Sequence, residues 1–319
     1  MGDWREKLKN PKVSALISAY NEEPYIAKCI ETLLKQTYKN MEIIVIDDGS
    51  TDKTVEIAKK YPVKIVKQNH LGLGASRNAG AKAAKGEIII FSDADLEYDR
   101  DYVKNLIRPI IEGKSIGTCH TQEGVANKNK IWARCWGIKR IPANIPKKIK
   151  TFRAILKKEF LKVGGCPTDK GTWDDAIFCD KLGQLADAVN DAICYHNNPE
   201  TLKETFYQNA WIGASFIKNK EAMGRYAKKF SILGVLLALI AVLFLSAVYF
   251  IFNLTLLQAF LVLLILVIIS PIILILLLTL SRTVGERYLK YLYALPVFYS
   301  VRLAGLVYGA VRRDLRKNA

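Results

Sequence analysis

Two aspartates, Asp93 and Asp95, stand one residue apart at the end of an apolar run, in the stretch "IIIFSDADLEYD" that begins at Ile88. Carboxylates at the mouth of a buried strand can hold a hard divalent cation through their oxygen atoms. Such a cation also binds a second anion, and a diphosphate is the natural candidate, because the cation neutralises the charge that develops as the diphosphate leaves. We therefore expect these aspartates to take part in Mg²⁺- or Mn²⁺-assisted chemistry.

Short β-rich runs alternate with helical patterns in the first half of the chain, so the elements that position these aspartates can be predicted. Four runs suit the buried strands of a parallel sheet, and helical patterns lie between them. The strands are predicted at Val13–Ser18, Glu42–Asp47, Val63–Lys67 and Ile88–Ser92, and the helices at residues 24–34, 50–61 and 75–85. This alternation indicates an α/β domain with a mainly parallel sheet.

Polar clusters follow three of the four predicted strands: "SAYNEE", "DDGSTD" and "SDADLEYD". Each cluster alone could simply form a turn or a helix cap, because Asp, Ser and Asn are common in both. Ligands of open α/β sheets, however, bind at the carboxyl ends of the strands. Because these ends share one edge of the sheet, we expect the clusters to converge on one ligand.

Four segments, in matching order, resemble the family-2 inverting glycosyltransferases of the GT-A fold: "ALISAYNEE", "EIIVIDDGSTDKT", "GLGASRNAGAKAAKGEIIIFSDADLEYD" and "VGGCPTDKGTWDDAIF". The resemblance covers about Pro11 to Ser215. It implies a Rossmann-like GT-A catalytic domain that takes a sugar from a UDP- or GDP-sugar with the help of Mg²⁺ or Mn²⁺. The resemblance does not identify the sugar or the acceptor.

The same resemblance implies a nucleotide-sugar site at the ends of the first strands. Its residues would be Ala19, Tyr20, Glu22, Asp48, Arg77, Asp93 and Ala94. Asp48 would accept a hydrogen bond from a ring N–H of uracil or guanine. Arg77 would meet the diphosphate, although it could equally be a surface residue of its helix. Asp93 would contact the ribose or the sugar.

Metal and acceptor residues follow from the resemblance as well. Asp95 would bind the metal, and His196 matches a position near the metal or the phosphates. Asp175, in "GTWDDAIF", matches the catalytic base, and one base suffices for inversion in a single displacement. The alternative is that the acids merely begin a helix, where the dipole favours them. The acceptor side would be formed by Trp173, Asp174 and Trp211.

The C-terminal third of the chain is strongly apolar, with no charged residue from Ser231 to Leu280. Residues 230–252 and 254–280 are each long enough to cross a bilayer, which takes about 20 residues. Basic residues flank both ends of this hairpin, so we expect a multi-pass protein of the cell membrane whose catalytic domain, residues 1–229, is cytoplasmic. Residues 288–311 are predicted to form an interfacial amphipathic helix or a third membrane helix, and residues 312–319 a basic tail.

The net charge of +17 suits a protein held against an anionic leaflet, where each nearby Lys or Arg contributes about 1 kcal/mol. We expect no nucleic-acid partner, because no nucleic-acid-binding module is visible. The six cysteines form no CxxC pair and indicate neither a metal cluster nor a disulfide framework. Aromatic and basic residues alternate from Trp132 to Lys150, and this segment is a candidate interfacial platform that presents a lipid-linked acceptor.

These patterns favour a metal-dependent inverting glycosyltransferase that acts on a membrane-associated acceptor, such as a hydroxyl group of a lipid-linked sugar or glycolipid. A polyprenyl- or dolichyl-phosphate sugar synthase is one alternative, although the Gly-x-Ser-Lys segment typical of those enzymes is missing after the base region. A catalytically inactive membrane scaffold is another. A sugar-nucleotide nucleotidyltransferase would require a Gly- and Arg/Lys-rich loop where this chain has "SAYNEE".

Overall fold

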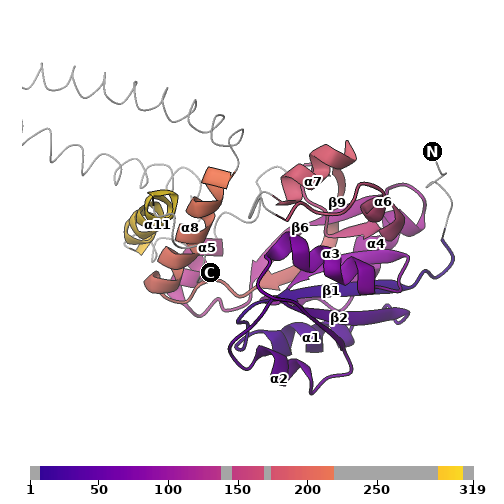
Figure 1. Cartoon of the computed structure of the whole chain (residues 1–319), viewed down its shortest axis with the longest axis horizontal. Helices are drawn as coiled ribbons and strands as arrows, with labels where there is room; N and C mark the ends of the chain where they lie inside the picture. The colour runs from indigo at the N-terminus through magenta and orange to yellow at the C-terminus, as the bar shows by residue number, and fades with distance from the viewer. Residues whose placement is uncertain (1–7, 138–145, 169–173, 219–293, 312–319) are drawn as a thin grey trace, which may run out of the picture. The chain divides into compact units, whose positions relative to one another are not determined.

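A computed structural model of the chain describes residues 8–137, 146–168, 174–218 and 294–311 (Figure 1). The chain divides into two compact units, residues 1–200 and 201–319, which are described separately. The first unit therefore ends before Ser215, the limit of the predicted catalytic core.

The four predicted strands all form, and they lie side by side in parallel. They are β1 (Val13–Ala19), β2 (Met41–Asp47), β3 (Lys64–Lys67) and β4 (Ile88–Asp93). Their order in the sheet is β3-β2-β1-β4, so β1 lies in the middle. The apolar residues of β1, β2 and β4 are almost completely buried, as continuous apolar runs in parallel sheets usually are.

The three predicted helices form between these strands; the first two are shorter than their patterns, and the third begins and ends two residues earlier. They are α1 (Ile26–Leu34), α2 (Thr54–Ala58) and α3 (Leu73–Ala83). The stripe Ile26, Cys29, Ile30 and Leu33 is the buried face of α1. Gly80 lets α3 approach the sheet closely, because a Cβ atom there would lie 2.8 Å from Cδ1 of Ile46.

The rest of the first unit extends the sheet on the other side of β4. Strand β8 pairs antiparallel with both β4 and β6, and β9 then pairs parallel with β6 and antiparallel with β5 and β7. The order continues β4-β8-β6-β9-β5. The remaining strands are β5 (Leu96–Tyr98), β6 (Gly117–Val125), β7 (Lys148–Ile149), β8 (Ala154–Leu156) and β9 (Ala186–His196). The remaining helices are α4 (Tyr102–Ile111), α5 (Ile131–Gly137), α6 (Lys157–Lys162) and α7 (Asp174–Leu182).

In the second unit, helices α8 (Leu202–Lys218) and α11 (Ala294–Val311) pack against each other. Gly213, Gly305 and Gly309 allow the two backbones to come close, and Nε of Arg302 donates to Oδ1 of Asn209 at 3.1 Å. Helix α11 falls within the helix predicted at residues 288–311. The predicted spans, 230–252 and 254–280, and the basic tail lie outside the described residues. No helix in the described part of the chain combines the length and apolarity that a membrane span needs.

The segment predicted as an exposed interfacial platform, Trp132 to Lys150, is only partly described. Trp136 is 8% exposed on α5, so little of its ring is accessible, and the interfacial platform stays a prediction. Lys148 and Lys150 form ion pairs with Asp187 and Asp180, which partly neutralises this stretch. Residues 138–145 lie outside the described part of the chain.

Candidate active site

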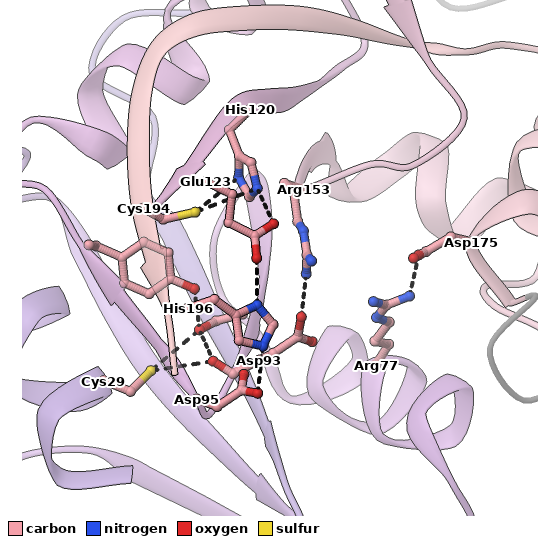
Figure 2. Close-up of polar contacts among 12 residues, drawn as sticks. Cys29, Arg77, Asp93, Asp95, His120, Glu123, Arg153, Asp175, Cys194 and His196 are labelled. Carbon is pink, nitrogen blue, oxygen red and sulfur yellow. Dashed lines mark hydrogen bonds and ion pairs between the residues drawn. The ribbon is translucent and has the colours of Figure 1, made fainter. Parts of the chain in front are cut away.

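The end of β4 carries Asp93, which forms an ion pair with a buried arginine. Nη1 of Arg153 donates to Oδ2 of Asp93 at 2.8 Å (Figure 2). Arg153 directly precedes β8, the antiparallel neighbour of β4, and sheet pairing therefore brings the two side chains together. Burial alone would raise the pKa of Asp93, but the positive charges of Arg153 and Arg77 hold it below its ordinary value. Asp93 is therefore a stable anion at neutral pH.

The turn after β4 presents Asp95 to the end of β9. Nε2 of His196 lies 2.7 Å from Oδ2 of Asp95, and Nδ1 of the same ring lies 2.5 Å from Oε1 of Glu123 on β6. The backbone is fixed as well, because the N–H of Asn197 donates to the carbonyl of Asp95 at 2.9 Å. Figure 2 shows the imidazole between the two carboxylates. Asp95 was predicted on the metal and His196 near the metal or the phosphates, and the structure brings the two side chains into contact.

The second oxygen of Asp95 is the best candidate for a metal ligand. Oδ1 is buried and has no hydrogen-bond partner among the described residues. A buried carboxylate oxygen without a partner is costly, and a divalent cation would satisfy it. Among the described residues, no three His, Cys, Asp or Glu side chains are arranged to hold a metal by themselves. This fits Mg²⁺ or Mn²⁺ bound through one or two carboxylates, water and substrate phosphates.

Glu22, in the loop after β1, belongs to the same acidic region. Burial, and then the negative charges of Asp95 and Asp93, raises the pKa of Glu22 from its ordinary value of 4.5 to about 8. The backbone N–H of Glu22 is fixed by Oγ1 of Thr54 at 2.8 Å. A cation bound nearby would reduce the repulsion between Glu22 and the two aspartates.

Asp175, the predicted base, lies near the start of α7 and forms an ion pair with Arg77 of α3. The Arg77 side chain is buried, whereas Asp175 is partly exposed, which leaves the carboxylate accessible to an acceptor. Burial alone would lower the pKa of Arg77, but the charge of Asp175 raises it. Trp173 lies outside the described residues, and the side chain of Asp174 does as well. Trp211 is exposed on α8 of the second unit.

Asp48, predicted to bind the base, holds the loop between β3 and α3. Its Oδ1 accepts hydrogen bonds from Nε2 of Gln68 at 2.6 Å and from the N–H of Leu71 at 2.8 Å, and its Oδ2 accepts from the N–H of Gly72 at 2.9 Å. Nδ1 of His70 lies 3.3 Å from Oδ2. A carboxylate offers about four acceptor positions, so little capacity remains for a nucleobase.

The aromatic side chains next to Asp48 are better placed to contact a base. The rings of Tyr20 and His70 lie with their centroids 4.1 Å apart, at an angle of 37°. Ala19, at the end of β1, is buried, and its carbonyl accepts from the N–H of Asp48 at 2.8 Å. Ala94 is buried between the two site aspartates. The predicted residues thus occupy the carboxyl ends of β1, β2 and β4, as expected.

The family described as Glycosyl transferase family 2 matches residues 14–171, which include the nucleotide-sugar part of this site. These residues of the chain therefore form a glycosyltransferase family 2 domain.

Relatives of this family-2 domain are found among bacteria. EpsH of Bacillus subtilis, named as a glycosyltransferase, is 39% identical over 118 residues, which are 35% of this chain and 34% of the relative. The cholesterol galactosyltransferase of Borreliella burgdorferi is 43% identical over 89 residues, which are 26% of this chain and 25% of the relative. The chain thus spans about a third or less of the length of these curated relatives.

The fold of the family-2 chain is also found in a solved structure. The mannosyltransferase PcManGT of Pyrobaculum calidifontis, in complex with GDP-Man and Mn²⁺, aligns with a TM-score of 0.57 at 19% identity, over 96% of this chain and 89% of that one. At this identity the likeness shows the fold alone. The predicted GT-A-like α/β fold is therefore confirmed.

Two residues of the family-2 site, Arg153 and Glu123, were missed as site residues by sequence reasoning. Arg153 stands in "FRAIL", between apolar residues of a strand-like run. A charged residue in such a run is rarely buried without a partner, and this was the available signal. Glu123 has no comparable signal, because its role depends on the pairing of β6 with β9.

Proposed function

We propose that the chain transfers a sugar from a UDP- or GDP-sugar to a hydroxyl acceptor, with inversion at the anomeric carbon. One observation carries this proposal: Asp93, Asp95, His196 and the Arg77–Asp175 pair meet at the carboxyl ends of the parallel strands. This edge is where α/β sheets bind ligands. PcManGT, which shares the fold, was solved with GDP-Man and Mn²⁺. A nucleotide sugar and a divalent cation are therefore compatible with the fold.

Asp95, through its unpartnered Oδ1, and His196 would hold the divalent cation, with Glu22 and Asp93 close enough to contribute charge. Bound there, a divalent cation would supply charge stabilisation for the departing diphosphate. Arg153 keeps Asp93 ionised and oriented toward the donor. The rings of Tyr20 and His70 would form an aromatic surface that contacts the nucleobase.

Asp175 would act as the general base of the single displacement. As the acceptor oxygen bonds to the anomeric carbon, the bond from that carbon to the diphosphate breaks, and Asp175 takes the proton from the acceptor hydroxyl. Arg77 orients the carboxylate through their ion pair. The side chain of Arg77 also lies within the electrostatic reach of Asp93, so the donor and acceptor sides of the site adjoin.

We further propose that the acceptor is a membrane-associated lipid, such as a lipid-linked sugar or glycolipid, and that the enzyme is anchored to the cell membrane by its apolar segment with the catalytic domain in the cytoplasm. The uncharged stretch from Ser231 to Leu280 supports this proposal. The Borreliella burgdorferi relative is named for cholesterol, a lipid whose reactive group is a hydroxyl.

The proposed function can be tested by ligand stabilisation and by donor hydrolysis. We expect UDP or GDP with Mn²⁺ to raise the melting temperature more than AMP or NAD, because a ligand at a hundredfold excess over Kd stabilises by about 2.7 kcal/mol. Wild-type protein should hydrolyse its donor slowly in the presence of Mn²⁺, and Asp95→Ala should not. Asp191→Asn, at an exposed ion pair with Arg108, is the matched control. Equal stabilisation by all nucleotides, without hydrolysis, would favour an inactive scaffold.

A further inference from the structure

We propose that Glu123 is a positioning residue, which holds the ring of His196 so that its Nε2 faces Asp95 and the cation site. This inference rests on the metal dependence included in the proposed function. It concerns a residue of the central sheet that lies outside the motifs of the chain. Glu123 would act only through His196, with no contact to substrate of its own.

The contacts of the imidazole define its orientation. Nδ1 of His196 lies 2.5 Å from Oε1 of Glu123, and Nε2 lies 2.7 Å from Oδ2 of Asp95. A carboxylate can only accept, so Nδ1 carries the proton of the first contact and, while no cation is bound, Nε2 carries that of the second. This fixes Nε2 as the nitrogen that faces Asp95, and it is the one that can bind a cation once it is unprotonated. Carboxylates beyond a metal-bound histidine commonly act in this way.

Strand pairing, rather than a flexible loop, sets the distance between Glu123 and His196. Strands β6 and β9 are parallel, with Glu123 opposite Cys194 and Val125 opposite His196. Glu123 and His196 are therefore diagonal neighbours on the same face of the sheet, a spacing that long side chains can bridge. The ring is held by two hydrogen-bonded strands and cannot move independently of them.

Glu123 also lies near a buried residue of the core. Its Oε2 lies 3.8 Å from Nε2 of His120, and Nδ1 of His120 lies 2.8 Å from the hydroxyl of Tyr102. His120 and Tyr102 are both buried, Tyr102 at the start of α4. Figure 2 shows the run from His120 through Glu123 to His196 and Asp95. Glu123 thus lies between His196 and a buried His120–Tyr102 pair.

Metal binding by the full-length protein provides the first test. Mn²⁺ affinity, measured by electron paramagnetic resonance in the presence of UDP or GDP, should fall by about 10–100-fold in Glu123→Ala. Glu123→Gln should retain most of the affinity, because its amide oxygen can still accept from Nδ1–H. The matched control is Thr121→Val, which removes a 2.9 Å hydrogen bond to Asn190 between the same two strands and should leave Mn²⁺ affinity unchanged.

The tautomer of His196 provides a second test, which does not depend on metal affinity. The chain has three histidines, so the imidazole ¹⁵N spectrum is simple, and His196→Asn assigns its signals. In the Mg²⁺-bound protein we expect Nδ1 of His196 to be protonated. The same experiment in Glu123→Ala should show a mixture of tautomers, a change that a purely structural role would not produce.

The outcomes separate this inference from the proposed function. If wild-type protein binds Mn²⁺ and Glu123→Ala binds it equally well, the positioning role is wrong while the metal site stands. An unprotonated Nδ1 in the wild type would also overturn it. If wild-type protein binds no Mn²⁺ with any nucleotide, both the metal dependence and this inference fail.

Discussion

Arg77 and Asp175, which are 98 residues apart in the sequence, form an ion pair that joins α3 to α7. The arginine is buried and the aspartate is 30% exposed. The pair therefore has a fixed cationic side and an accessible anionic side. A general base needs this combination, because it must stay ionised and still meet its substrate. Arg77 was predicted to bind the diphosphate, and its observed partner is the predicted base.

Replacing Arg77 with methionine should destabilise the domain. Met keeps the apolar stem but removes the charge, so Asp93 and Asp175 lose a buried cation. Because Asp175 can still be solvated, we expect a loss of about 1–3 kcal/mol in the free energy of unfolding, measured in urea. The control is Arg108→Met at the exposed Arg108–Asp191 pair, which should cost no more than about 1 kcal/mol. Equal losses in both variants would show that the buried ion pair stabilises the protein no more than the exposed one.

Asp175→Asn tests the base directly. The amide is nearly isosteric with the carboxylate but cannot take a proton, so we expect sugar transfer to slow by about 10²–10⁴. Nucleotide affinity, measured by calorimetry, should change little. Asp180→Asn is the matched control, because Asp180 lies on the same helix and pairs with Lys150 at the surface. A variant with wild-type transfer rates would remove Asp175 from the mechanism.

The sequence was sufficient to predict the parallel half of the sheet. Val13–Ala19, Met41–Asp47 and Ile88–Asp93 are mainly apolar runs with polar residues at or just after their ends, and both features are local. The convergence of Asp93 and Asp95 on one edge followed from these strands together with the rule that ligands bind at their carboxyl ends.

The partners of these residues could not be predicted in the same way. Arg153 reaches Asp93 over 60 residues, and Glu123 reaches His196 over 73, through strands that pair out of sequence order. Asp48 shows a different limit. Its residue type suited a base acceptor, but the backbone N–H groups of the following loop occupy its oxygens. The type of a residue indicates which ligand groups it can bind. It does not reveal whether other groups of the same chain already occupy its hydrogen-bonding positions.

The raised pKa of Glu22 predicts a pH dependence of stability. Between the ordinary pKa of 4.5 and the folded-state pKa of about 8, the folded protein holds a proton that the unfolded chain has released. The free energy of unfolding should therefore fall as pH rises through this window, by at most about 1.4 kcal/mol per pH unit from this group. Glu22→Gln cannot ionise and should flatten the slope, measured by urea unfolding from pH 5 to 8. Parallel slopes in the two proteins would contradict the assignment.

Asp48→Ala should loosen the loop before α3. The backbone N–H groups of Leu71 and Gly72 would lose their acceptor, and we expect a cost of about 1–3 kcal/mol. Faster hydrogen exchange at these two amides would be the direct sign. If Asp48 instead served mainly to bind the base, the variant would keep its stability and its amide protection while its nucleotide affinity fell.

The acceptor class can be decided by the need for a base. A polyprenyl-phosphate oxygen is already ionised at neutral pH and attacks without losing a proton, whereas a hydroxyl must lose one as the new bond forms. Because Asp175 is oriented by its ion pair with Arg77 and remains partly exposed, we expect a hydroxyl acceptor. Purified enzyme should glycosylate a lipid-linked sugar and leave polyprenyl phosphate unmodified, and Asp175→Asn should nearly abolish the reaction. If polyprenyl phosphate is the better acceptor and Asp175→Asn retains most of that rate, both the acceptor class and the role of Asp175 are wrong.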